Sequence, residues 1–171
     1  MTSDTTHREQ APLPEATLER FAREVAKYPP AGKQSAVMAC LAIVQQEEGY
    51  ISELREREIA DYLGMAPIAV HEVTTFYNMY NQQPVGKFKL NVCTNLPCQL
   101  RDGQAALAHV CRKLDVAVGG TTADGQFTVQ QSECLGACAD APVMLVNDRE
   151  MISFMSNERI DDLLATLAQA K

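Results

Sequence analysis

The stretch Lys87-Phe-Lys-Leu-Asn-Val-Cys-Thr-Asn-Leu-Pro-Cys98 joins a strand pattern to a pair of cysteines. Polar and apolar residues alternate over residues 87–93, which predicts a β-strand with one apolar face. That face would carry Phe88, Leu90 and Val92. The strand ends on Cys93, and Cys98 follows after four intervening residues. A cysteine delivered by the end of a strand predicts a ligand site at the edge of a sheet.

A second cysteine pair follows a second strand pattern. Residues 126–132 alternate again and lead into Cys134-Leu-Gly-Ala-Cys138. Between the two strands, residues from about 100 to 114 show a helical pattern with Leu107, Val110, Cys111 and Leu114 on one face. A strand, helix, strand unit is normally a right-handed crossover with parallel strands. Both strand ends then share one edge, so the topology predicts that the four cysteines converge.

The remaining elements of this half predict a thioredoxin-like domain over residues 84–171. Residues 143–146 and 151–154, joined around Asn147 and Asp148, indicate a β-hairpin. A last helix starts at Asn157. Its inward positions are Ile160, Leu163, Leu164 and Leu167. The β-α-β-β-β-α order predicts a four-stranded mixed sheet with a thioredoxin-like arrangement.

The N-terminal half has the period of helices instead. Residues 1–12 are polar and aperiodic, which indicates a mobile tail. Helical patterns then begin near residues 14, 34, 53 and 67, with Gly49 and Gly64 as stops for the second and third. The stripe predicted for the fourth helix includes Val70, Val73 and Tyr77. Short connections between these patterns predict a helical bundle over 13–83, so the whole chain belongs to the α+β class.

Charge and hydropathy narrow the possible functions. The chain has 171 residues, 46% of them apolar, and a formal net charge of −7, which disfavours nucleic acid as the main partner. Residues 58–77 look like a helix-turn-helix, yet no Lys or Arg lies between Arg57 and Lys87.

The N-terminus lacks the apolar stretch of a secretory signal. The longest apolar run, 36–44, is short of the roughly 20 residues that span a bilayer. We therefore expect a cytoplasmic protein that is not inserted directly into a membrane.

Four converging thiolates would suit an iron–sulfur cluster or a structural zinc ion. The spacing of the two pairs leaves both options open, whereas a thiol–disulfide oxidoreductase would need a Cys-x-x-Cys motif that neither pair has. Small residues surround the second pair and allow backbone N–H groups to approach sulfur: Gly136, Ala137, Ala139 and Ala141. The helix after Cys98 would direct its positive end toward the site. Both features favour an iron–sulfur cluster.

The other cysteines and the histidines are predicted to play structural roles. Cys40 and Cys111 fall on core-facing helical positions, where a lone thiol behaves as a small apolar side chain. His7, His71 and His109 pair with no evident nucleophile. We therefore predict no catalytic acid–base residue in this chain.

Three motifs together resemble the E subunit of bacterial NADH:quinone oxidoreductase, respiratory complex I. They are residues 75–80 (Thr-Phe-Tyr-Asn-Met-Tyr), 93–98 and 133–142 (Glu-Cys-Leu-Gly-Ala-Cys-Ala-Asp-Ala-Pro). The resemblance implies one [2Fe-2S] cluster held by Cys93, Cys98, Cys134 and Cys138, with one iron on each pair. Corresponding subunits of NAD-reducing hydrogenases and NAD-dependent formate dehydrogenases share this motif set, and a zinc-bound interaction or DNA-binding module remains the other alternative.

The same resemblance implies an electron carrier within an oxidoreductase complex. FMN and NAD would then be bound only by a flavin-bearing partner subunit, with other peripheral-arm subunits completing a complex attached to the inner membrane. The glycines of this chain form neither Gly-x-Gly-x-x-Gly nor Gly-x-x-x-x-Gly-Lys, the turns that hold nucleotide phosphates. We therefore expect that the isolated chain does not turn over NADH.

Overall fold

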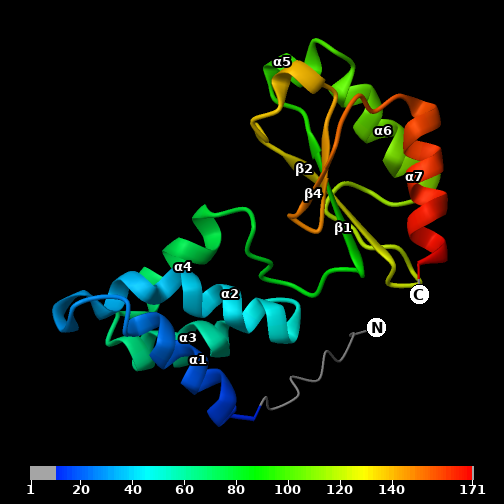
Figure 1. The fold of residues 1–171 in the computed structure, drawn as a ribbon. Coiled ribbons are helices and arrows are strands. Elements are labelled where there is room, and N and C mark those ends of the chain that lie inside the picture. The colour runs from blue at the N-terminus through cyan, green and yellow to red at the C-terminus, as the bar shows by residue number, and fades with distance from the viewer. Residues whose placement is uncertain (1–10, 171) are drawn as a thin grey trace. The chain divides into compact units, whose positions relative to one another are not determined.

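The computed structural model describes residues 11–170 (Figure 1). Its α-helices and β-strands form two compact units that divide between Pro84 and Val85. The predicted tail, 1–12, lies almost wholly outside the described residues, and the predicted domain bounds stay predictions. Helices make up the first unit and a mixed sheet with helices the second, so the predicted α+β class is confirmed.

The first unit contains a short 3-10 helix and four α-helices. They are α1 (Glu15–Val25), η1 (Pro30–Ala36), α2 (Val37–Glu48), α3 (Glu53–Leu63) and α4 (Pro67–Phe76). Gly49 and Gly64 end α2 and α3 with φ of 83° and 68°, as predicted. The prediction that the second helix starts near residue 34 was wrong, because residues 30–36 wind as a tighter 3-10 helix. Pro30 and Gly32 are poor α-helix formers, which favours this short segment.

The core of the first unit is a single apolar cluster. Its fully buried members include Phe21, Ala36, Cys40, Leu41, Val44, Ile59 and Val70. They come from all four α-helices and from η1. Burying a side chain such as leucine or phenylalanine stabilises a fold by roughly 1.5–3 kcal/mol before the entropy of ordering is subtracted. The helical unit is therefore held together mainly by this cluster.

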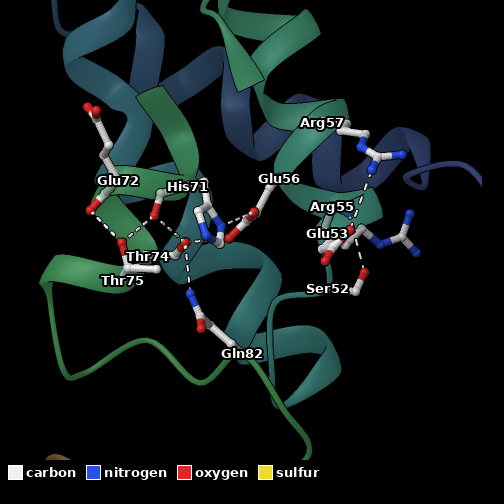
Figure 2. Close-up of polar contacts among 10 residues, drawn as sticks. All are labelled: Ser52, Glu53, Arg55, Glu56, Arg57, His71, Glu72, Thr74, Thr75 and Gln82. Atoms are coloured by element: carbon white, nitrogen blue, oxygen red, sulfur yellow. Dashed lines mark hydrogen bonds and ion pairs between the residues drawn. The ribbon is translucent and has the colours of Figure 1, made fainter. Parts of the chain in front are cut away.

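The predicted inward face of helix α4 is only partly correct. Val70 is buried and Val73 packs partly buried against the core, as predicted, but Thr74 is also buried and Tyr77 is exposed. The reason is visible in Figure 2: the Thr74 hydroxyl donates to the buried carboxylate of Glu56 on α3. A buried carboxylate needs hydrogen-bond donors, so this polar contact overrides the apolar pattern.

The second unit is built on a four-stranded sheet in the order β2-β1-β3-β4. The strands are β1 (Phe88–Cys93), β2 (Phe127–Ser132), β3 (Met144–Val146) and β4 (Glu150–Ile152). β1 and β2 are parallel, with Cys93 opposite Ser132, and β3 and β4 form the predicted antiparallel hairpin. Helices α6 (Gly103–Leu114) and α7 (Asn157–Gln169) pack together and share one apolar core with the sheet (Figure 1). The thioredoxin-like order of elements is therefore confirmed.

The helix predicted from about residue 100 begins slightly later, and a separate short helix precedes it. A short α5 (Leu96–Gln99) contains Cys98, and α6 begins only at Gly103. Asp102 separates them with a φ of 66°. A Cβ on Gly103 would lie 2.8 Å from the carbonyl oxygens of Cys93 and Cys98, so only glycine fits this close approach. The start of α6 is therefore packed directly against the first cysteine pair.

Strand β1 is covered on both faces, which simple alternation does not predict. Lys89 and Asn91, on its polar face, are buried. Asp148 in the β3–β4 turn accepts a hydrogen bond from Asn91 Nδ2 at 2.7 Å and lies 2.5 Å from Lys89 Nζ. The β3–β4 turn therefore lies against β1, and its Asp148 carboxylate pairs with the buried ammonium group of Lys89.

Replacing Asp148 with alanine should destabilise the fold by about 3 kcal/mol, because it removes the carboxylate that pairs with a buried ammonium group. Urea denaturation of the full chain would measure this loss. Asp162→Ala, an exposed aspartate on α7, is the matched control and should change stability by less than about 0.5 kcal/mol. Equal stabilities for the two variants would contradict the role assigned to Asp148.

Candidate metal centre

The four candidate cysteines come from two loops at the carboxyl edge of the sheet. Cys93 is the last residue of β1 and Cys98 lies in α5. Cys134 follows β2, and Cys138 opens the short 3-10 helix η2 (Cys138–Asp140). The parallel register of β1 and β2 brings both strand ends to one level. Both strand ends therefore lie at the same edge of the sheet, as the topology predicted.

The sulfur atoms are in contact within each pair, and the two pairs influence each other electrostatically. The Sγ atoms of Cys134 and Cys138 are 3.9 Å apart. Cys98 forms a side-chain hydrogen bond with Cys93, and its thiol also feels the charge of Cys138. Cys138 in turn feels the charge of Cys93. All four thiols are free.

The two cysteine pairs differ in their exposure to solvent. Cys93 and Cys98 are 2% and 1% exposed and pack with Ala141 and Val143, whereas Cys134 and Cys138 are exposed. Burial raises the pKa of the Cys98 thiol to about 11, and the neighbouring Cys93 adds to the rise. The hydrogen bond with Cys134 is the main cause that raises the pKa of Cys138. Both shifts disfavour the charged thiolate form of Cys98 and Cys138. A bound cation would favour that form.

Backbone and side-chain hydrogen bonds fix the loops. The Gly136 N–H donates to Cys134 Sγ at 3.4 Å, from a backbone with φ of 78°. Asn95 Nδ2 donates to Glu133 Oε2 at 3.0 Å, which ties the first cysteine loop to the second. A second tie runs from Gln131 Nε2 to Thr94 Oγ1 at 2.7 Å. The sequence did not predict these ties, because each joins residues that lie far apart along the chain.

The donor set at this edge consists of sulfur, arranged as one buried and one exposed pair. Two thiolates on each side, with a backbone N–H already directed at one sulfur, fit a cluster of two irons bridged by sulfide. Among residues 11–170, no group of three or more His, Cys, Asp and Glu side chains is already arranged to hold a metal ion.

The remaining cysteines and histidines have structural surroundings. Cys40 is fully buried in the core of the first unit, and burial raises its pKa to about 12. Cys111 packs beside the core of the second unit, where burial also raises its pKa. His71 pairs with Glu56, and His109 lies 2.7 Å from Asp161. His7 lies outside the described residues.

The sheet order, the two cysteine pairs and the donor set define a class of iron–sulfur protein. The model of the thioredoxin-like [2Fe-2S] ferredoxin family matches residues 21–168. The chain belongs to this family. It is 42% identical over 146 residues to NADH-quinone oxidoreductase subunit 2 of Thermus thermophilus, covering 85% of this chain and 81% of that one. It is also 37% identical over 153 residues to the NADH-quinone oxidoreductase E 2 subunit of Rhizobium meliloti, covering 90% and 89% of the two chains.

A solved structure shares the fold. The chain resembles part of an NAD+-reducing [NiFe]-hydrogenase with a TM-score of 0.65 and 23% sequence identity. The match covers 77% of this chain but only 22% of the hydrogenase chain. At that identity the likeness shows the fold alone. In the part of the chain that the structure describes, no helix combines the length and apolar character needed to cross a bilayer.

Proposed function

We propose that this chain is the electron-carrying [2Fe-2S] subunit of an NADH:quinone oxidoreductase, exchanging one electron with a flavin- and NADH-binding subunit. The convergence of two cysteine pairs at one sheet edge carries the proposal. Relatives covering most of this chain and bearing the name of that enzyme support it. The chain would act as a subunit of an oxidoreductase, not as a complete enzyme.

In this proposal Cys93 and Cys98 hold one iron, and Cys134 and Cys138 hold the other. The cluster, when bound, supplies one-electron transfer. The protein would position the ligands, because the register of β1 and β2 places the two cysteine loops at the same edge of the sheet. The Gly136 N–H, already directed at Cys134 Sγ, would lower the negative charge on that sulfur.

The partner would bind FMN and NAD, since a one-electron centre cannot accept both electrons of a hydride by itself. Other peripheral-arm subunits would complete the complex and connect it to the inner membrane. An equivalent subunit of an NAD-reducing hydrogenase is the second candidate, because such subunits share the motif set of residues 75–80, 93–98 and 133–142. Both candidates require the same cluster and a flavin-bearing partner.

The test measures the metal and sulfide content of the protein and its turnover of NADH. Anaerobically purified protein should contain two irons and two acid-labile sulfides per chain, whereas stoichiometric zinc without sulfide would assign a structural zinc site instead. The chain alone, mixed with NADH and a dye acceptor, should reduce no dye. NADH should reduce the cluster once the flavin-bearing subunit is added. Turnover by the chain without flavin would contradict an electron-carrier role.

The cluster should have a low reduction potential, near that of plant-type ferredoxins at roughly −400 mV. Glu133 and Asp140 flank the second cysteine pair, and Arg101 is the one nearby cation in sequence after the first pair. Added negative charge would therefore be poorly compensated. Redox titration followed by electron paramagnetic resonance measures the midpoint, and a value far above that range would refute this interpretation of the local charge.

A further inference from the structure

Helix α4 has an exposed apolar face in addition to its buried one. Val70 and Thr74 form the buried face. On another side of the helix, Ile68 is 63% exposed and Phe76 79% exposed, and Tyr77 just after the helix is 39% exposed. Single exposed apolar side chains are ordinary, but several on one helix indicate an interaction surface.

A hollow of about 470 Å³ lies on this exposed side. It is lined by Ala69, Glu72, Val73, Thr75, Phe76 and Tyr77. Residues 72 and 73 each lie three or four positions from both residue 69 and residue 76, so the four side chains follow one side of the helix. The Phe76 and Tyr77 rings meet edge to face with centroids 5.0 Å apart. We call Ile68 and these six lining residues the α4 outer face.

The polar side chains of α4 are engaged elsewhere. Figure 2 shows His71 and Thr74 directed toward Glu56 of α3, with His71 Nδ1 2.9 Å from Glu56 Oε2. The Thr75 hydroxyl donates to the His71 carbonyl oxygen at 2.8 Å. Glu72 extends its carboxylate away from the Glu56 contacts (Figure 2). Among the six residues lining the hollow, Glu72 therefore supplies the carboxylate.

These contacts also hold the outer face in place. The buried Glu56 carboxylate binds His71 and Thr74, which lie three positions apart on α4. Gln82 Nε2 lies 3.5 Å from Thr74 Oγ1 and connects the following segment to the same network. A surface on a helix fixed in this way loses little conformational entropy when it binds.

The charge around the outer face indicates the chemistry of its occupant. Glu72 is the charged residue among those that line the hollow, and no Lys or Arg occurs in the sequence between Arg57 and Lys87. Charge complementarity therefore favours a partner with basic residues beside an apolar side chain. A second copy would bring another Glu72 to the same contact, and nucleic acid would meet no cation.

We propose that the α4 outer face is the surface through which this chain docks on its flavin-bearing partner. The partner would place an apolar side chain against Phe76 and Tyr77 and a Lys or Arg beside Glu72. This proposal rests on the proposed function, because that function supplies the partner. It adds the surface and the chemistry of the contact.

The experiment measures binding of the full, cluster-loaded chain to the flavin-bearing subunit by isothermal titration calorimetry. Phe76→Ser should weaken binding by about tenfold or more, as expected when a central aromatic side chain is lost from an interface. Glu72→Lys should also weaken binding, increasingly at low ionic strength, because like charges would then face each other across the contact. Leu54→Ser, the same kind of apolar-to-polar change at a leucine 40% exposed on α3, is the matched control and should bind like the wild type.

Each outcome separates the two proposals. Wild-type affinity in both the Phe76 and Glu72 variants, with unchanged thermal unfolding, would overturn the docking surface and leave the proposed function standing. Failure of the wild-type chain to bind the flavin-bearing subunit would overturn both. A wild-type chain that dimerises alone, and becomes monomeric on Phe76→Ser, would assign the face to a second copy and overturn the docking proposal.

Discussion

Replacing any one of Cys93, Cys98, Cys134 or Cys138 with serine should remove or severely damage the cluster. In the proposed ligand set each side chain would supply a thiolate that no other nearby residue can replace, because the free cysteines outside the site, Cys40 and Cys111, lie in the apolar cores of the two units. Iron content per chain should fall by more than about tenfold, and the visible absorption of the protein should fall with it. Iron and sulfide analysis of anaerobically purified variants provides the measurement.

Cys40→Ser and Cys111→Ser are the matched controls. Each places a hydroxyl in apolar surroundings, which should destabilise the fold by about 1–3 kcal/mol while the iron content stays near two per chain. The buried Cys40 should show the larger effect of the two. Cluster loss in either variant while it remains folded would contradict the assignment of the four ligands.

Gly103→Ala should disturb the cluster although Gly103 is not a candidate ligand. The added Cβ would lie 2.8 Å from the carbonyl oxygens of Cys93 and Cys98, and backbone atoms can yield only by moving the first cysteine loop. We expect a loss of about 1–3 kcal/mol in the free energy of unfolding, together with an altered electron paramagnetic resonance spectrum of the reduced cluster. Denaturation and spectroscopy on the same preparation would measure both.

Gly86→Ala provides a closely matched control. Its Cβ would lie 2.9 Å from backbone atoms of Gln126 and Phe127, next to the beginning of β2 and away from the cysteine edge. The variant should therefore be destabilised to a similar extent but keep the wild-type cluster spectrum. If the two variants gave the same spectrum, the close approach of Gly103 to the cysteine loop would have no effect on the cluster.

Much of the fold follows from periodicity in the sequence. Helix α3 occupies the residues that the pattern indicates, since Gly64 stops it and Ser52 caps its start. The parallel pairing of β1 and β2 follows from the strand, helix, strand order, and the convergence of the cysteines follows from that pairing. These features depend on local patterns and a general rule of chain topology, so one sequence suffices to predict them.

Other features depend on tertiary contacts that periodicity cannot represent. The start of α6 at Gly103 depends on how closely that residue approaches the Cys93 and Cys98 carbonyl groups. Thr74 is buried because Glu56, 18 residues earlier, needs a hydrogen-bond donor. Likewise, the tie between Asn95 and Glu133 joins residues 38 positions apart. In each case the partner is distant in sequence, so no local pattern indicates it.

The unequal depth of the two cysteine pairs has a consequence for how the holoprotein is assembled. Cys93 and Cys98 are sealed beneath Ala141 and Val143, while Cys134 and Cys138 face solvent. Since Asn95 and Glu133 already join the two loops, the folded apoprotein exposes the second pair to solvent while the first pair is buried. Iron and sulfide delivered by a donor would therefore meet Cys134 and Cys138 first and reach the inner pair last.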